Sequence, residues 1–370
     1  MNFFFSYKRL TVDKSFLPIK ERLDTLGLVI RDLRELIWFQ RAELPVARDG
    51  LGAVFANKKI YAIGGRSDFG ENSMIQTSDS FVDEYDPNDN TWVSKEKMLY
   101  PHTHHAVVAA SDGKIYTLGG YIKISVETQN DPQYTVLASM GSISNMLQRY
   151  DPVTNQWKLM QAMPLFRVFP GAVATHNGLI FAIGGLGYNF VWPDLNQPPA
   201  TPPDKYKYLA EVHKYDINTD SWVPVAPMPT ARCGLAAVLG NDGLIYAIGG
   251  VDDECQRVAT VEAYDPVADS WEKKADMPTP RSDLSAVVGS DGNIYAIGGV
   301  SEWDSIGTVE VYYPASNTWA TGAPLQIDRL CFGATVTDEG MIYVIGGSQH
   351  TLNVGMSTRK FLSSVERSGL

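Results

Sequence analysis

The chain has 370 residues, of which 42 are acidic and 31 basic, so its net charge at pH 7 is -11. This charge repels polyanions, and no Lys/Arg-rich run interrupts it, which disfavours binding to nucleic acid or to an anionic membrane surface. The three cysteines, Cys233, Cys255 and Cys331, form no CxxC pair and are odd in number, so they do not suit a disulfide framework.

The N-terminal residues do not have the pattern of a signal peptide. Residues 1–9 place their positive charge after a short apolar stretch, the reverse of the usual order, and no run of about 18 apolar residues occurs elsewhere. We therefore expect a cytoplasmic protein.

Residues 1–35 form an N-terminal extension with a helical pattern. Its apolar residues recur at alternating spacings of four and three, which predicts an amphipathic helix. They are Ile19, Leu23, Leu26, Ile30, Leu33 and Ile37. This helix either packs on the rest of the protein or serves as a docking or self-association element.

The remainder of the chain repeats. Gly-Gly occurs six times, each time after a short apolar run such as residues 60–63, and most of these runs follow an Asp-Gly or similar turn. The pairs are Gly64-Gly65, Gly119-Gly120, Gly184-Gly185, Gly249-Gly250, Gly298-Gly299 and Gly346-Gly347. Fixed repeats of about 50 residues with several short β-patterned runs are typical of propeller blades.

A second element of the repeat is a tryptophan seven residues after a tyrosine, as in Tyr264 and Trp271. Ten residues beyond each tryptophan stands an arginine or a histidine. Gly-Gly followed by such a tryptophan resembles the kelch-repeat β-propeller family over about residues 36–370. The resemblance implies an all-β, six-bladed propeller in a single domain.

The two ends of the chain are predicted to share the last blade. After Gly346-Gly347 the sequence ends before any tryptophan, so the sixth blade lacks its outer strand. Residues 38–48 align in step with residues 271–281, from tryptophan to arginine. The N-terminal strand around Trp38 is therefore expected to complete the sixth blade and leave no open sheet edge.

Four antiparallel strands per blade, a to d, place the b–c and d–a loops on one face of the disc. From Gly-Gly to the strand-c tyrosine there are 13 or 14 residues in blades four and five, but 20 in blade one and 30 in blades two and three. Because long loops on a rigid scaffold usually carry function, we expect the binding site on this face.

The residues ten positions after each tryptophan are the first candidates for binding. Arginine suits bidentate capture of carboxylate, phosphate or sulfate. In kelch domains that bind acidic peptides, arginines at comparable loop positions do this, and Arg66, directly after Gly64-Gly65, resembles another of them. The repeat set is Arg48, His102, Arg167, Arg232, Arg281 and Arg329. The alternative is that each arginine braces its blade by pairing with a strand-c acid such as Glu262, Glu310 or Glu366.

Aromatic residues of the same loops are further candidates. Tyr188 and Trp192 lie in the long third loop, where they either contact a partner or anchor the loop. Trp303 stands in the short b–c loop of blade five, where it is hard to bury, and it is the better contact candidate.

Little in the sequence points to catalysis. His102, His104 and His105 supply two metal ligands at most, because alternate strand residues face opposite sides, so no metal or cofactor is predicted. Other kelch propellers are sialic-acid mutarotases, and Asp252, Asp253, Glu254 or Glu302 could stand over the channel as a general base.

Two functional classes follow. The first is a monomeric, scaffold-like module that captures an acidic segment of a partner protein on the b–c/d–a face. The second is a small-molecule enzyme such as a sugar isomerase, in which a loop carboxylate has a raised pKa. A third possibility is a structural propeller that binds through its N-terminal helix.

Overall fold

The computed structural model describes residues 37–67, 78–122, 142–187, 206–353 and 356–369, and every regular element in these ranges is a β-strand. The all-β prediction is confirmed. The expected N-terminal helix, Tyr188 and Trp192 lie outside the described residues. No helix that could span a membrane is found in the described ranges.

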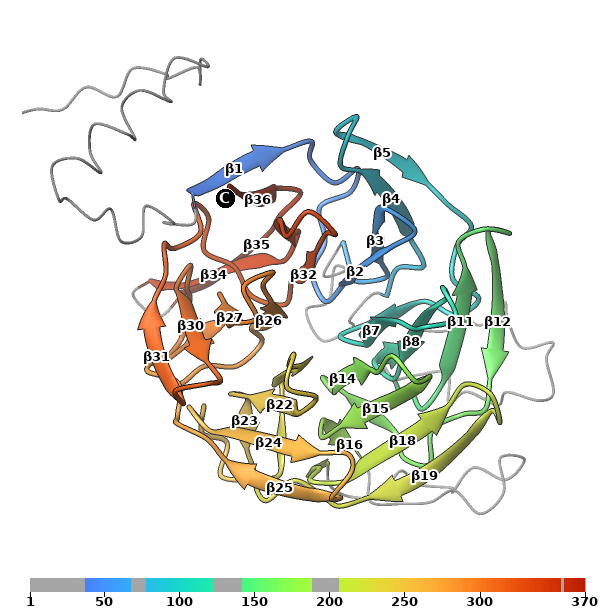
Figure 1. Ribbon diagram of the computed structural model, residues 1–370. Helices are drawn as coiled ribbons and strands as arrows, with labels where there is room; N and C mark the ends of the chain where they lie inside the picture. The colour runs from blue at the N-terminus through green and yellow to red at the C-terminus, as the bar shows by residue number, and fades with distance from the viewer. Residues whose placement is uncertain (1–36, 68–77, 123–141, 188–205, 354–355, 370) are drawn as a thin grey trace, which may run out of the picture.

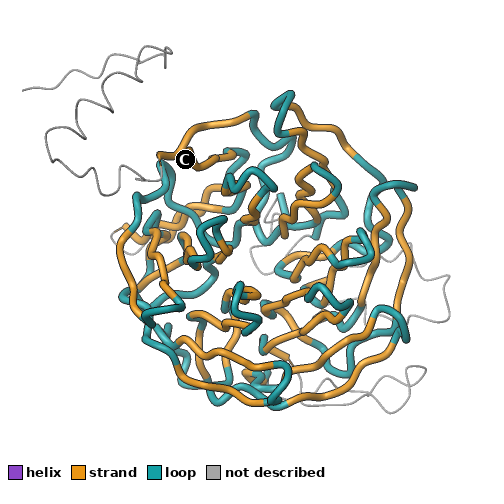
Figure 2. The backbone as a smooth tube through the Cα atoms, in the orientation of Figure 1, coloured by secondary structure: helices purple, strands orange, loops and turns teal. Residues whose placement is uncertain are grey.

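Six four-stranded antiparallel sheets account for most of these strands, and we number them in chain order. Figure 1 shows them arranged as a ring around a central axis, and Figure 2 shows the loops that join them. Sheet one contains β2 (Gly52–Ala56), β3 (Lys59–Ile63), β4 (Val82–Asp86) and β5 (Thr91–Ser94). Sheet two contains β7 (Ala106–Ala109), β8 (Ile115–Leu118), β11 (Leu147–Asp151) and β12 (Gln156–Met160). Sheet three contains β14 (Gly171–Ala174), β15 (Leu179–Ile183), β18 (Val212–Asp216) and β19 (Ser221–Val225). Sheet four contains β21 (Ala236–Leu239), β22 (Ile245–Ile248), β24 (Val261–Asp265) and β25 (Ser270–Lys273). Sheet five contains β26 (Ser285–Val288), β27 (Ile294–Ile297), β30 (Val309–Tyr313) and β31 (Thr318–Thr321). Sheet six contains β32 (Gly333–Val336), β33 (Ile342–Ile345), β36 (Val365–Gly369) and β1 (Ile37–Arg41).

The sequence of each strand matches its place in the ring. The second strand of sheet four, β22, is continuously apolar and buried, because a neighbouring sheet covers each of its faces. The outer strand β25 is mostly exposed. Gly249 and Gly250, which follow β22, have φ angles of 64° and 108°. A Cβ at these positions would lie 2.6 Å from Arg281 O and 2.7 Å from Cys233 O, so only glycine fits.

Buried apolar side chains fill the gap between each pair of neighbouring sheets. In the part of the chain that the structure describes they form six clusters, one for each gap around the ring. The repeat tryptophans take part in joining the sheets: Trp271 Nε1, for example, donates a hydrogen bond to Ala226 O of the preceding sheet at 2.9 Å. This is a scaffold role for the tryptophan ladder.

A closed circle of backbone hydrogen bonds joins all six sheets. One residue at the start of each sheet donates its N–H to the carbonyl of the equivalent residue in the sheet before it, at 2.7 to 3.0 Å. All six have positive φ angles, between 51° and 64°. These circle residues are Gly50, His104, Phe169, Gly234, Asp283 and Cys331. Because Gly50 donates to Cys331, the first and last sheets are joined in the same way as all the others.

The N-terminal strand β1 completes the sixth sheet by pairing with the C-terminal strand β36, from Ile37 opposite Gly369 to Arg41 opposite Val365. Trp38 is 3% exposed and packs in the gap between sheets five and six. Its indole N–H donates to Ala323 O at 3.0 Å. The predicted pairing of the two chain ends is therefore present.

The b–c and d–a loops lie together on one face, as expected. Short strands of the b–c loops pair with the residues that begin strand a: β6 (His102–Thr103) with β9 (Tyr121–Ile122), β13 (Arg167–Val168) with β16 (Leu186–Gly187), and β20 (Arg232–Cys233) with β23 (Val251–Asp252). β10 (Ser142–Ile143) and β17 (Lys207–Tyr208) extend the first two of these small sheets. We call this side, made by the b–c and d–a loops, the channel-mouth face.

Candidate site at the channel mouth

The repeat arginines do not point into the channel mouth. Arg48, Arg167, Arg232, Arg281 and Arg329 all have 0% exposed surface. Four of them form ion pairs with an acid on strand c of the same sheet: Arg48 with Asp83 at 2.7 Å, Arg232 with Glu262 at 3.1 Å, Arg281 with Glu310 at 3.0 Å and Arg329 with Glu366 at 2.5 Å. This burial and pairing do not support the prediction that the repeat arginines contact a ligand, and the geometry favours the bracing alternative.

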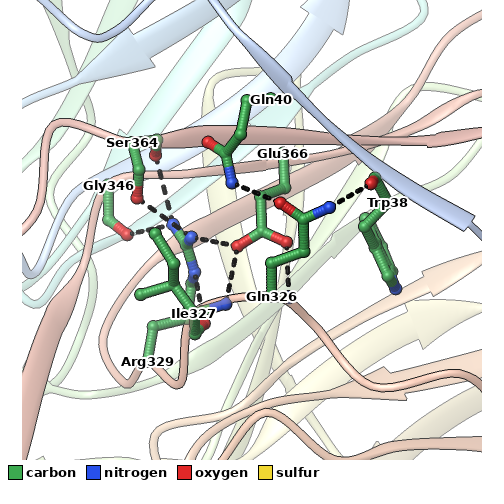
Figure 3. Close-up of polar contacts among 8 residues, drawn as sticks. All are labelled: Trp38, Gln40, Gln326, Ile327, Arg329, Gly346, Ser364 and Glu366. Carbon is green, nitrogen blue, oxygen red and sulfur yellow. Dashed lines mark hydrogen bonds and ion pairs between the residues drawn. The ribbon is translucent and has the colours of Figure 1, made fainter. Parts of the chain in front are cut away.

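Figure 3 shows this brace in the sixth sheet. Glu366 accepts a hydrogen bond from Arg329 Nη2 and two more from the backbone N–H groups of Gln326 at 2.8 Å and Ile327 at 3.2 Å. The Gln326 side chain donates in turn to Trp38 O at 2.5 Å. The arginine thus ties the d–a loop to strands b and c, and in this sheet the same network reaches the N-terminal strand.

Burial changes the acid–base properties of these guanidinium groups. Removal from water lowers the pKa of Arg281 to about 10, and the neighbouring Glu310 partly offsets this effect. The same desolvation lowers the pKa of Arg48, Arg232 and Arg329. Each cation is therefore held by its acid and by main-chain carbonyls, such as Ala296 O for Arg281 at 3.1 Å, and is not available to a ligand.

Sheets two and three depart from the arginine–acid pattern. In sheet two His102 is 0% exposed, and its Nδ1 lies 2.9 Å from Gln148 Nε2. Histidine and glutamine thus replace the arginine and the acid of the four sheets that keep the pattern. In sheet three Arg167 Nη2 donates to His213 Nδ1 at 2.9 Å. Burial and the Arg167 charge lower the pKa of His213 to about 4, so this imidazole is neutral in the native protein. His102 is a bracing residue like the arginines.

Arg66 lies at the seam between the first and sixth sheets and is 3% exposed. Its Nε donates to Asp49 Oδ1 at 2.7 Å. The same carboxylate accepts from Ser348 Oγ at 2.7 Å and from Arg359 Nη2. The expected role of Arg66 as an exposed ligand contact is therefore not supported by its position.

Trp303, by contrast, is 66% exposed, which agrees with the prediction that its loop cannot bury it. It stands between the short strands β28 (Val300–Ser301) and β29 (Asp304–Ser305) on the channel-mouth face. The Arg257 guanidinium lies 5.8 Å from the centre of its ring. Among the predicted binding residues that the structure describes, Trp303 is the one that solvent reaches freely.

A small cavity of about 100 Å³ opens where the six sheets meet, and the circle residues line it. Phe169, Leu235, Leu284 and Phe332 supply apolar surface, while Asp283 supplies a carboxyl group. Burial raises the pKa of Asp283, and a hydrogen bond from Ser282 Oγ and the charges of Arg359 and Arg257 act against that rise.

Sequence reasoning missed Asp283. The acids that it singled out lie apart from the cavity: Asp253, Glu254 and Glu302 are exposed, and Asp252 is half-buried. Asp283 stands two residues after Arg281. Two other sheets have glycine at the equivalent position, Gly50 and Gly234, and this difference is the signal that could have identified Asp283. Cys331 beside it is no nucleophile, because burial and the Asp283 carboxyl raise the pKa of its thiol well above the ordinary value.

Three arginines outside the repeat set act electrostatically on groups that line this cavity. Arg359 and Arg257 act electrostatically on Asp283, and Arg66 and Arg359 act on His104 and Cys331. Within the described residues, no group of three or more His, Cys, Asp or Glu is placed to hold a metal ion.

Comparison with known proteins agrees with this architecture. The Kelch motif matches residues 47–99, 102–164, 168–229, 232–278 and 283–326, well over half of the chain. These matches fall on sheets one to five. The sixth sheet, which combines the two ends of the chain, lies outside them.

Two curated relatives are kelch-repeat or scruin proteins. "Kelch repeat and BTB domain-containing protein 12" of Danio rerio is 29% identical over 206 residues, which is 55% of this chain and 30% of that protein. "Beta-scruin" of Limulus polyphemus is 30% identical over 162 residues, 44% of this chain and 14% of that protein. The matched regions thus span less than a third of either relative.

A solved structure described as "Structure of YjhT" superposes with a TM-score of 0.63 and 18% identity, over 86% of this chain and 99% of that one. This similarity shows a shared fold.

Proposed function

Because the chain belongs to the kelch-repeat family, we propose that it is a protein-binding module whose channel-mouth face captures an anionic segment of a partner. The proposal treats the six sheets as the blades of a complete six-bladed propeller, and the closed circle of hydrogen bonds supports this count. A fold of this kind supplies a rigid platform, and the site on it determines the ligand. The cytoplasmic location and monomeric state stay predictions.

The observation that carries the proposal is that Arg257 and Arg359 both act electrostatically on Asp283, which lines the cavity. They come from the b–c loops of the fourth and sixth sheets, so the fold brings together cations that are distant in sequence. Arg257 and Arg359 retain solvent exposure. A guanidinium next to a partly apolar surface suits a carboxylate, since its planar fork can donate two hydrogen bonds to one acid.

The opposite face of the ring would repel such a segment. Its a–b and c–d turns carry twelve carboxylates and three lysines. The acids are Asp86, Asp89, Asp112, Asp151, Asp216, Asp220, Asp242, Asp265, Asp269, Asp291, Asp338 and Glu339, and the lysines are Lys58, Lys59 and Lys114. The acids outnumber the lysines on this face by nine, so an acidic partner is disfavoured there.

The test is affinity capture from a lysate with matched charge reversals. Arg257→Glu should abolish capture of the partner, whereas Lys58→Glu, on the opposite face, should leave it unchanged. Capture by the wild type should weaken as salt concentration rises. Retention of the same partners by Arg257→Glu would show that anionic capture at this site is wrong.

One observation favours a second candidate, the small-molecule enzyme such as a sialic-acid mutarotase-like sugar isomerase. Asp283 lines the cavity and burial raises its pKa, as a general base near neutral pH requires. Its test is the rate at which the anomers of N-acetylneuraminic acid interconvert, followed by NMR. Acceleration by the wild type that Asp283→Asn removes would support catalysis, and an unchanged rate would exclude this substrate.

A further inference from the structure

Trp303 stands on a platform built by three consecutive sheets. It occupies the tip of the β28–β29 hairpin of sheet five, where Ser301 pairs with Asp304. On one side the sixth sheet contributes His350, whose Nδ1 lies 2.6 Å from Trp303 O and donates to it. On the other side the fourth sheet contributes Arg257, whose Nη1 donates to Glu302 O at 2.5 Å. Both tip carbonyls are thus held by neighbouring sheets.

The platform has further support from the long hairpin of sheet six, β34 (Ser348–Asn353) and β35 (Met356–Phe361). His350 N donates to Ser305 Oγ at 3.2 Å, and Ser305 Oγ lies 3.3 Å from His350 O. The indole is therefore carried by a preorganised backbone, although the side chain itself is 66% exposed. Preorganisation reduces the conformational entropy that binding would cost.

The fold does not require a tryptophan at this position. The equivalent short b–c loop of sheet four carries Asp253, Glu254 and Cys255 at its tip, and all three are exposed. An indole that is 66% exposed buries little apolar surface for the fold, whereas Trp and Arg are among the residues that most often dominate binding energy at interfaces. The Trp303–Arg257 pair therefore has the composition of an interaction hot spot.

The geometry limits what this pair can bind. Arg257 lies over the indole, so the opposite ring face is the one that a partner can cover. Arg257 Nη1 donates to Glu302 O, and Nε is buried out of reach of a partner, so a partner would have to bind the outer edge formed by the two terminal nitrogens. A planar guanidinium held this way presents its edge to a carboxylate, while the indole offers a flat surface for stacking.

We propose that Trp303 and Arg257 form a two-part recognition site for a segment with an acidic side chain beside an aromatic one. The acid binds the Arg257 guanidinium, and the aromatic ring stacks on the free face of Trp303. This inference rests on the proposed function and deepens it by naming the chemistry of the captured segment. It places the main contact at the junction of sheets four to six, away from the buried repeat arginines.

The experiment uses a phage-displayed library of random 12-residue peptides, selected on the full-length protein. Selected peptides should be enriched in Asp or Glu adjacent to Phe, Tyr or Trp. Their affinities are then measured by fluorescence polarisation for the wild type and for three variants. Trp303→Ala and Arg257→Lys should each weaken binding about 10- to 30-fold, the second because lysine keeps the charge but loses the planar fork.

Tyr313→Ala is the matched control, because Tyr313 is an exposed aromatic side chain at the opposite end of sheet five. It should change the affinity less than twofold. All variants should keep the wild-type melting temperature, since their side chains contribute little to the core. A library that yields no binder, selected sequences without the acidic–aromatic pair, or binding that survives Trp303→Ala would each overturn the inference.

Capture of the full-length partner separates this inference from the proposed function. If Trp303→Ala retains the partner while Arg257→Glu loses it, the two-part site is wrong and anionic capture stands. If both variants retain the partner, both proposals are wrong. Loss of the partner with both variants supports both proposals, and loss with Trp303→Ala alone overturns both, because Arg257→Glu then leaves capture intact.

Discussion

Asp49 and Arg359 are 310 residues apart in the chain and form an ion pair across the seam between the first and sixth sheets. Asp49 is fully buried and also accepts hydrogen bonds from Arg66 and Ser348. One carboxylate thus connects two arginines and joins the first sheet to the long hairpin of the last. The seam where the ring closes is therefore held by side chains as well as by the β1–β36 pairing.

We predict that Asp49→Asn destabilises the protein by about 3–5 kcal/mol, because it leaves two cations without their buried counter-charge. Urea unfolding measures the change as a lower midpoint at unchanged slope. Asp338→Asn is the control, since Asp338 forms a 3.7 Å pair with Lys58 in which both partners are exposed. That change should cost less than about 1 kcal/mol. Equal losses for the two variants would mean that the seam network contributes nothing special.

The buried brace of sheet five tests the role of the repeat arginines. Arg281→Ala should destabilise the protein by about 3–5 kcal/mol, since Glu310 would be left as an unpaired buried charge. The double change Arg281→Met with Glu310→Leu should recover most of this loss, because no charge remains to be desolvated. Both variants, when folded, should capture the partner as the wild type does. Selective loss of capture without loss of stability would restore the binding role that the sequence suggested.

A further prediction concerns the contribution of the N-terminal strand β1 to stability. Trp38→Ala should cost about 3–5 kcal/mol, because it removes a buried indole from the gap between sheets five and six. Phe39, the next residue on β1, is 46% exposed and serves as the control, and Phe39→Ala should leave the melting temperature nearly unchanged. If the two changes have the same effect, β1 does not anchor the ring in solution.

His105 offers a stabilising substitution. It is 7% exposed, and neither ring nitrogen has a hydrogen-bond partner in the described structure. Four of the other sheets place Leu51, Leu235, Leu284 or Phe332 at the same position. His105→Leu should therefore raise the free energy of unfolding by about 1–3 kcal/mol. His176→Leu, at an exposed turn, should not, and a destabilised His105→Leu would reveal an unrecognised partner of the imidazole.

The buried histidines predict acid sensitivity. Desolvation lowers the pKa of His105 to about 3 and that of His213 to about 4, and it lowers the pKa of His102 and His104 well below 6.5. The unfolded chain therefore binds more protons than the native state below pH 6.5. Stability should rise with pH between about 4 and 6.5 and fall as the pH drops through this window.

His213→Gln tests this pH dependence at one position. Sheet two has Gln148 at the equivalent position, and a glutamine oxygen can accept the hydrogen bond from Arg167. The variant should lose part of the pH dependence while keeping its stability at pH 7.5. Urea unfolding across this pH range measures both, and an unchanged slope would show that His213 does not contribute.

Much of the architecture could be read from local pattern. Gly249 and Gly250 are required where the chain passes carbonyl oxygens too closely for a Cβ, and Trp271 recurs where one sheet must cover the next, so both leave a periodic signal. The pairing of β1 with β36 was also accessible, because residues 38–48 repeat the spacing of residues 271–281. Such features follow from repetition, since each sheet solves the same packing problem.

The repeat, the resemblance to the kelch family and the meeting of the two chain ends all follow from the order of the amino acids. Which cations face solvent depends on how the sheets pack in three dimensions. Arg281 and Arg257 look equally available in the sequence, yet Arg281 is enclosed by Glu310 and strand carbonyls while Arg257 lies against an exposed indole. Burial and pairing depend on contacts between segments far apart in the chain, and residue type and spacing do not specify those contacts. For the same reason Asp283 became visible only when six circle residues from six sheets met at one cavity.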